Sequence, residues 1–460
     1  MAADDHGGDP CDPHPPDPDQ PDPDLEVAVP PEPGEADALA PTARLTRAVR
    51  SLAIDVTPLR TSRDFRLVWL GEIVSETGSQ FTLVALYIQV YNLTGSSLAV
   101  GGIGIAQLVP LLLVSIFGSP LIDRIDRRRL LLLSQVVQAG GSGLLLLGAV
   151  VGNPPLLLVY AAAGVVGGVS GFALSTRSAL TPTLVPAEQL PQALALNQAM
   201  WNTALIAGPA IGGVVVAQFG LASAYAIDTA SFVATIVAAV MMSPHPPVVS
   251  HDVAHTGLRA VGEGFRYLRG RRVLQSTFIV DLIAMIFGMP RAVFPVLAHA
   301  QFHRGDAVVG LLFSAPAAGA LIGALTTGWV GRVRRQGLAV LVAVAIWGTG
   351  ITLFGLAGDR LLLALLCLAV AGGADVVSAV FRSTILQLSV PDDLRGRMSA
   401  VHILVVTGGP RIGDLEAGGI ASAFTPTVSV VSGGLLCLGG VALLALAVPA
   451  FARYRSGDEV

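Results

Sequence analysis

The chain has 460 residues, of which 53% are hydrophobic and only 13% are charged. A soluble globular protein carries roughly 25% charged residues, so this composition excludes a water-soluble body of this length. The net charge of -4 hides an asymmetry, because residues 1–40 contain 12 acidic residues and no Arg. All 28 residues counted as Lys or Arg are Arg. Without Lys the chain has no Walker A loop and no Schiff-base lysine, so an ATP-driven pump within it is excluded as well.

The amino-terminal segment is acidic and rich in proline, as in Asp17-Pro18-Asp19. Low hydrophobicity and charge of one sign prevent such a segment from forming a core. It also lacks the basic start and the apolar stretch of a secretory signal peptide. We therefore expect residues 1–60 to form a disordered cytoplasmic tail, and a role in binding a partner stays open.

Long apolar runs follow the tail, and one membrane-spanning helix needs about 20 apolar residues. Uncharged stretches such as Thr77 to Ile122 hold two spans each, separated by short polar turns. Leu144 to Leu147 show none of the apolar–polar alternation of a transmembrane β-barrel. We predict an all-α membrane protein with twelve transmembrane helices. They are expected at residues 66–90, 97–120, 130–151, 155–177, 190–217, 221–243, 273–298, 306–330, 337–357, 361–382, 398–423 and 427–450.

Arginine occurs before the first span and after every even-numbered span, the last included. The odd-numbered turns contain almost none, with Arg304 and Arg360 as the exceptions. Because positive charge is retained in the cytoplasm, both termini and the middle loop are predicted to be cytoplasmic. The protein is then a multi-pass component of the cell (inner or plasma) membrane. In this scheme Arg177 and Arg382 are cytoplasmic residues that follow the fourth and tenth spans.

The chain contains an internal repeat with an offset of 205 residues. Arg177-Ser178 with Val185-Pro186 recurs as Arg382-Ser383 with Val390-Pro391, and Gly208 and Gly213 recur as Gly413 and Gly418. Transporters built by duplication show such repeats. We predict two pseudo-symmetric six-helix bundles, at residues 61–243 and 273–452. A cytoplasmic linker at 244–272 joins them, and a short cytoplasmic tail at 453–460 ends the chain.

The turn after the second span contains Gly118, Asp123, Arg124, Arg127 and Arg128. Their spacing resembles the signature loop of the major facilitator superfamily; the equivalent turn in the second half lacks the acid. Asp123 lies near a helix end, where it can pair with an arginine or with the positive start of a neighbouring helix. Such a contact can stabilise one conformation of the transporter and break in the other. The arginines of the loop also keep it on the cytoplasmic side of the membrane.

Further segments narrow the resemblance, among them Phe65 to Trp69, Gln107 to Pro110, Ala374 to Ser378 and Gly409 to Asp414. Together they are similar to the enterobactin-exporter branch of proton-driven efflux carriers, which includes macrolide-efflux relatives. The similarity covers about residues 60–450. It implies outward antiport of a drug or siderophore-like metabolite against protons.

Charged residues within the spans are the candidate functional groups, because a charge at the bilayer centre costs about 2.5–3.5 kcal/mol. At about 1.5 Å per residue, Glu76, Asp281 and Asp375 lie roughly 10–15 Å into their helices. Glu72 and Glu76 share one helical face, a pairing suited to carrying a proton. Arg411 and Asp414 are three residues apart and are expected to pair with each other. Substrate contact and structural hydrogen bonding are the alternatives for these residues.

The sequence favours a proton-coupled antiporter that exports an amphipathic small molecule by alternating access. The alternatives are an importer or uniporter of a small nutrient, a non-transporting receptor or scaffold, and a membrane enzyme. No hydrolase or metalloprotease motif is present, so we predict no enzymatic activity. Scattered Cys and His residues predict no metal site. The expected partners are a small-molecule substrate, protons and the lipid bilayer, with no cofactor and no nucleic acid, and we expect a monomer.

Overall fold

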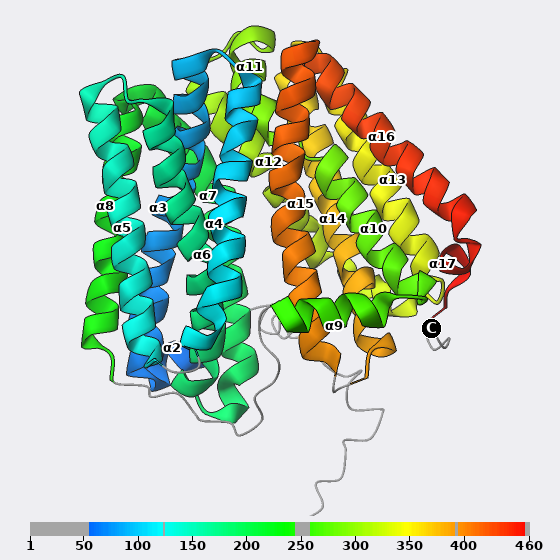
Figure 1. The fold of residues 1–460 in the computed structure, drawn as a ribbon, viewed down its shortest axis with the longest axis horizontal. Helices are drawn as coiled ribbons and strands as arrows, with labels where there is room; N and C mark the ends of the chain where they lie inside the picture. The colour runs from blue at the N-terminus through cyan, green and yellow to red at the C-terminus, as the bar shows by residue number, and fades with distance from the viewer. Residues whose placement is uncertain (1–54, 123–124, 244–257, 392–393, 456–460) are drawn as a thin grey trace, which may run out of the picture. The chain divides into compact units, whose positions relative to one another are not determined.

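The computed structural model describes residues 55–122, 125–243, 258–391 and 394–455, and all regular structure in these ranges is helical (Figure 1). The first half of the chain contributes α2 (Thr57–Thr61), α3 (Arg63–Thr94), α4 (Ser97–Ile122), α5 (Arg127–Val151), α6 (Leu156–Leu184), η2 (Ala187–Gln189), α7 (Leu190–Phe219) and α8 (Leu221–Met241). The second half contributes α9 (Leu258–Leu268), α10 (Arg272–Phe287), η3 (Arg291–Val293), α11 (Phe294–Val296), η4 (Leu297–Gln301), α12 (Asp306–Leu325), η5 (Thr327–Arg332), α13 (Gln336–Gly355), α14 (Leu361–Ser389), α15 (Arg395–Ala423), α16 (Pro426–Ala447) and α17 (Pro449–Arg453).

Ten helical segments of the described chain are long and apolar enough to cross a membrane. The helices α3 and α15 have similar lengths, 32 and 29 residues, and carry several charged side chains each. Large apolar side chains point outward from the bundles; Leu157 and Leu446 are each 79% exposed. Such surfaces are stable only in lipid. The predicted all-α membrane fold is confirmed, and the helix count is consistent with the twelve spans expected.

The helices pack as two bundles that correspond to the two halves of the chain (Figure 1). In the first bundle α3 packs against α7 and α8, and α5 packs against α6 and α8. In the second bundle α13 packs against α14 and α16, and α10 packs against α15 and α16. The bundles contact each other mainly through two helix pairs, α4 with α15 and α7 with α12.

Glycines at repeat-related positions make equivalent contacts in the two bundles. A Cβ atom at Gly208 would lie 2.5 Å from the Cβ of Gln80, and one at Gly413 would lie 2.4 Å from the carbonyl oxygen of Met285. Both members of the second pair are 205 positions after their counterparts in the first, which is the offset found in the sequence. Only glycine permits this close helix approach. The repeat therefore extends from the sequence to the packing of α7 on α3 and of α15 on α10.

Glycines also line the contacts between the bundles. A Cβ atom at Gly310 on α12 would lie 2.1 Å from the carbonyl oxygen of Pro209 on α7. One at Gly101 on α4 would lie 2.3 Å from the carbonyl oxygen of Asp414 on α15. These contacts involve the first turns of α4 and α12. They bring backbone against backbone at the end of the bundles that the arginine pattern predicts to be outside the cell.

The seventh predicted span, residues 273–298, is not one continuous helix. The helix α10 ends at Phe287, and the chain continues through Gly288 and Pro290 into η3, α11 and η4. Proline lacks a backbone N–H and its ring clashes with the preceding turn, which breaks the helix. The predicted eighth span is also too long, because α12 ends at Leu325 and η5 follows. The break after α10 matters because it positions Arg291.

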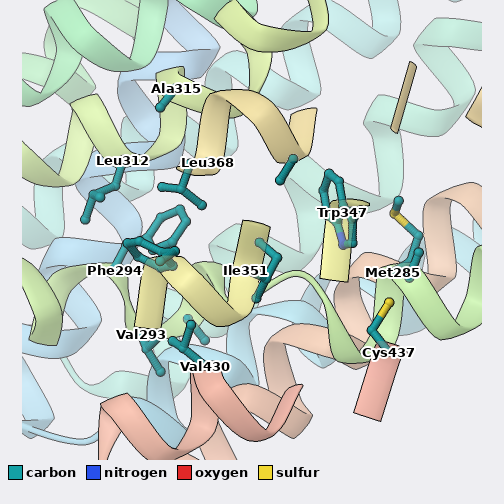
Figure 2. Packing of buried hydrophobic residues seen from close by; sticks show 14 of the residues in the cluster. Met285, Val293, Phe294, Leu312, Ala315, Trp347, Ile351, Leu368, Val430 and Cys437 are labelled. Carbon is teal, nitrogen blue, oxygen red and sulfur yellow. The ribbon is translucent and has the colours of Figure 1, made fainter. Parts of the chain in front are cut away.

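The broken segment is held by an aromatic core (Figure 2). The ring of Phe294 on α11 meets those of Phe313 and Phe354 edge to face, with centroids 5.1 and 6.1 Å away. The side chains of Phe294, Ile351 and Leu368 gather in the same core, with Leu312 beside them. Edge-to-face rings add about 0.5–1.5 kcal/mol beyond their buried area. This core ties α11 to α12, α13 and α14.

Part of the predicted linker is helical, because α9 (Leu258–Leu268) lies across the ends of neighbouring helices (Figure 1). It packs against the start of α15, where Glu263 forms an ion pair with Arg397 at 2.9 Å. Residues 244–257 of the predicted linker lie outside the described residues. So do residues 1–54 of the tail predicted at 1–60 and residues 456–460 of the tail predicted at 453–460, whereas α2 begins at Thr57.

Candidate functional site

The first candidate site is a cluster of charges inside the first bundle. Nε of Arg177 on α6 lies 2.8 Å from Oε2 of Glu72 on α3, and Nη1 of the same arginine pairs with Oε1 of Glu76. Nε2 of Gln135 on α5 donates a hydrogen bond of 3.4 Å to Oε1 of Glu72. Because the two glutamates are one turn apart on α3, one planar guanidinium can contact both.

A related cluster lies inside the second bundle. Nη1 of Arg382 on α14 pairs with Oδ1 of Asp281 on α10, and its Nη2 lies 3.7 Å from Oδ1 of Asp375. Arg382 and Asp281 follow Arg177 and Glu76 by 205 residues each. The arginine–acid pair is therefore the same feature in both halves, placed between the fourth and first helix of each bundle.

Arg177 and Arg382 were expected as cytoplasmic residues at the ends of the fourth and tenth spans, and the helices that carry them are longer than predicted. Each arginine lies within its helix, since α6 continues to Leu184 and α14 to Ser389. Their side chains are only 17% and 8% exposed. The topology prediction, which assigned arginines to cytoplasmic loops, treated both as loop residues because an uncharged run of the sequence ends at each of them. In the structure a carboxylate on a neighbouring helix compensates each charge, so the helix extends past it.

A cavity of 260 Å³ lies beside the second cluster and is lined by both bundles. The first bundle contributes residues such as Gln80 and Pro209, and the second contributes Arg291, Trp347 and Asp375. The side chain of Asp375 is 32% exposed, whereas that of Asp281 is only 3% exposed. Among the three predicted midplane acids, Asp375 thus lines this cavity, Asp281 is covered by Arg382, and Glu76 pairs with Arg177.

The expected pairing of Arg411 with Asp414 is wrong. Asp414 accepts hydrogen bonds from Nη2 and Nε of Arg291, at 2.7 and 3.3 Å, and from the hydroxyl of Tyr87 at 2.8 Å. Nη1 of Arg411 instead donates to the carbonyl oxygen of Thr407 on its own helix, at 2.6 Å. The helix break at Pro290 places Arg291, and not Arg411, against Asp414. The spacing of residues in the sequence does not reveal this arrangement.

The contacts of Asp414 join the two bundles, because Tyr87 belongs to α3 and Asp414 to α15. All three side chains of this group, Tyr87, Asp414 and Arg291, lie near the end where α4 meets α15. We call them the interbundle triad. Asp414 is fully buried, and a charged hydrogen bond in such a place contributes about 1.5–3 kcal/mol.

In the signature loop, Arg127 and Arg128 bind backbone carbonyl groups of neighbouring helices, and only the acceptor of Arg128 lies in the last turn of its helix. Nη1 of Arg127 donates to the carbonyl oxygen of Ala179 at 2.9 Å, and Nε of Arg128 donates to that of Ala239 at 2.7 Å. A cation near the last turn of a helix is favourable because carbonyl groups there lack partners. Gly118 lies near the end of α4, and Asp123 and Arg124 lie outside the described residues, so the predicted latch at Asp123 stays a prediction.

Two further groups did not emerge from sequence reasoning as principal candidates. Asp228 on α8 accepts hydrogen bonds from the hydroxyls of Thr82 and Ser142, at 2.6 and 2.7 Å, and so joins α8 to α3 and α5. His402 on α15 lies against Phe278, with ring centroids 6.4 Å apart. The sequence does signal both groups, because each is an ionisable residue inside an apolar run. It does not reveal their partners, which come from helices distant in the chain.

Two related helix bundles, charges compensated inside them and a cavity lined by both define a membrane transporter of the major facilitator fold. The sequence matches the family described as Transmembrane secretion effector over residues 53–457, and the chain belongs to that family. This confirms the resemblance seen in the sequence. The chain is 29% identical to the enterobactin exporter EntS of Citrobacter koseri over 416 residues, which cover 89% of this chain and 98% of that protein.

Solved transporter structures share the fold at low sequence identity. A POT family transporter in complex with 5-aminolevulinic acid is 12% identical and superimposes with a TM-score of 0.69, covering 85% of this chain and 97% of that one. A variant of the nucleoside transporter NupG is 11% identical, with a TM-score of 0.67, covering 85% of this chain and all of that one. At such identities the likeness concerns the fold alone.

Proposed function

We propose that this protein is a proton-coupled antiporter that exports an amphipathic small molecule across the cell membrane, with both termini in the cytoplasm. The relatives named enterobactin exporters support outward transport and a siderophore-like or drug-like cargo. The single observation that carries the proton-coupling proposal is the position of Asp375, a carboxylate on the cavity wall beside a buried arginine.

The proposed coupling depends on Arg382 having two unequal acid partners. Its Nη1 is paired with the buried Asp281, whereas Asp375 is 3.7 Å from Nη2 and 32% exposed. A proton that binds Asp375 from the cavity removes the weaker attraction and leaves the Asp281 pair intact. The arginine therefore stays compensated in both protonation states, which allows Asp375 to titrate without leaving an unpaired buried charge.

The interbundle triad is the proposed outer gate of the transport cycle. Alternating access requires the bundles to separate at one end while they close at the other. In the structure the hydroxyl of Tyr87 from the first bundle donates to Asp414 of the second, and Gly310 packs on Pro209. Opening toward the outside would break both contacts. The cavity beside Asp375 would then exchange its contents with the outer medium.

The test is a transport assay in cells that lack the gene. Cells carrying the wild-type chain should accumulate less of a fluorescent amphipathic drug, and a protonophore should abolish the difference. Asp375→Asn should abolish export while membrane abundance is unchanged. Asp359→Asn, in the exposed turn before α14, is the matched control and should export normally. Export that resists the protonophore would refute the coupling, and increased accumulation with the wild-type chain would favour import.

A further inference from the structure

An apolar groove runs along the lipid-facing side of the second bundle, outside the transport cavity. It consists of two adjoining hollows of 500 and 250 Å³ that share Ile346 on α13 and Val370 on α14. The side chains along it are exposed, including Val342 at 50% and Leu353 at 50%. Among the described residues that line it, Arg335 at one end is the single charged one. The occupant must therefore be apolar along most of its length.

The groove is nearly as long as the hydrocarbon core of a bilayer is thick. It extends along α13 from Arg335 to Leu353, and 18 residues of α-helix span about 27 Å. The hydrocarbon core of a bilayer is about 30 Å thick. An extended hydrocarbon chain fits such a groove, whereas a compact metabolite does not.

The end of the groove near η5 is basic. Arg335 lines it, and Arg332 and Arg334 are close in the chain; all three side chains are exposed. No carboxylate lies within ion-pair distance of them in the part of the chain that the structure describes. Trp329, 46% exposed, lines the same end, as is typical of residues at a membrane surface. Arginine binds phosphate oxygens in a fixed planar geometry.

We propose that the groove binds an anionic phospholipid. The headgroup phosphate contacts Arg335, and one acyl chain lies along the seam between α13 and α14. The arginine pattern assigns the basic end to the cytoplasmic side, so the lipid comes from the inner leaflet. Charge complementarity and the apolar length of the groove carry this assignment, which does not depend on the transported substrate.

The groove also adjoins the helix that carries the second charge cluster. Ala374, Val377 and Phe381 on α14 line the groove, and Asp375 and Arg382 are their neighbours in the chain. Lipid in the groove thus packs against the helix that holds the cavity-facing carboxylate. Loss of the lipid is expected to lower the melting temperature of the protein, because α14 then loses apolar contacts on that side.

The experiment measures binding and thermal stability of the purified full chain with added phosphatidylglycerol or phosphatidylcholine, by native mass spectrometry and melting. Phosphatidylglycerol should bind more tightly and raise the melting temperature. Arg335→Gln should weaken its binding by about tenfold, since a charged hydrogen bond is lost. Arg332→Gln removes the same charge from the same region but not from the groove, and should bind as the wild type does. Equal losses in the two variants, or equal binding of the two lipids, would overturn the proposal.

A second pair of probes tests the acyl chain. Val342→Trp fills the groove from an exposed position and should weaken binding of long-chain phosphatidylglycerol, while inorganic phosphate alone should stabilise neither protein. Stabilisation of the wild type by inorganic phosphate to the same extent as by the lipid would show a phosphate site without a lipid, and would overturn the acyl-chain assignment.

Discussion

The two charge clusters are related by the repeat, yet each has a different second acid. Arg177 pairs with Glu76 as Arg382 pairs with Asp281, from equivalent helices. In the first bundle the second acid, Glu72, comes from the same helix as the first. In the second bundle Asp375 comes from the helix of the arginine itself, two turns earlier. The arginine–acid pair is common to both halves, and the third member of each cluster differs.

Exposure separates the two clusters further. Glu72 and Glu76 are 3% and 12% exposed, and Gln135 donates to the former, so the first cluster is enclosed. Asp375 is 32% exposed and lines the cavity. The difference suggests a division of labour, in which the first cluster joins helices and the second responds to the cavity. Four experiments follow, in order of the expected effect on stability; three test this division and one tests the interbundle triad.

Removal of the second-bundle arginine should have the largest effect. Arg382→Gln leaves Asp281 buried without its cation, and breaking a buried pair costs about 3–5 kcal/mol. Melting of the purified protein should show this loss. Adding Asp281→Asn to the same variant should restore most of the stability, because no buried charge then remains. Identical melting of the single and double variants would contradict the ion pair as the cause.

Removal of one acid from the first cluster should have a smaller effect. Glu72→Gln leaves Arg177 paired with Glu76, so the loss should be about 1.5–3 kcal/mol, the contribution of a charged hydrogen bond. The same melting assay applies, with Glu76→Gln as the companion variant. If Glu72→Gln is as damaging as Arg382→Gln, the two glutamates do not share the arginine, and the comparison fails.

Removal of one hydroxyl from the interbundle triad should loosen the contact between bundles. Tyr87→Phe removes a single donor to Asp414, with an expected loss of about 0.5–1.5 kcal/mol. Labelling of Ser97→Cys, which is buried against Gly418, by a membrane-impermeant thiol reagent should then rise roughly two- to tenfold, as that free energy implies. Asn153→Cys, in an exposed turn, is the control and should label equally in both backgrounds. Unchanged labelling at Ser97→Cys would exclude the hydroxyl as part of a gate.

Neutralisation of the cavity acid should change stability least. Asp375→Asn removes a half-buried carboxylate 3.7 Å from its partner, and such pairs contribute about 0–1 kcal/mol. The melting temperature should stay close to that of the wild type although export is lost. A large drop in melting temperature would instead make Asp375 a structural member of the cluster, like Glu72.

The fold was predictable because the membrane restricts it so strongly. Backbone groups in lipid must be satisfied within helices, so long apolar runs indicate spans directly. The seventh span shows where this reasoning ends, since its apolar run continues through Gly288 and Pro290 although the helix stops at Phe287. Hydropathy measures the cost of placing a segment in lipid and not the continuity of its hydrogen bonds.

The candidate site was predictable in part. Glu72 and Glu76 were expected to act together, and the structure shows them on one arginine, because neighbours on a helix are set by local geometry. The pairing of Asp414 was wrong, because its partners come from α3 and from the segment after α10. The positions of Arg177 and Arg382 were misassigned because their compensating acids are on other helices.

The sequence by itself determined the class of protein, the two halves and the residues that carry charge into the membrane. Periodic and compositional signals suffice for these, since they depend on local helix geometry and on transfer from water to lipid. Only the tertiary structure decided which charged side chains pair, including Arg291 with Asp414. It also decided that Asp375 lines the cavity while Asp281 is covered by Arg382. These pairings depend on helix rotations and on a proline break, and separation along the chain carries no information about them.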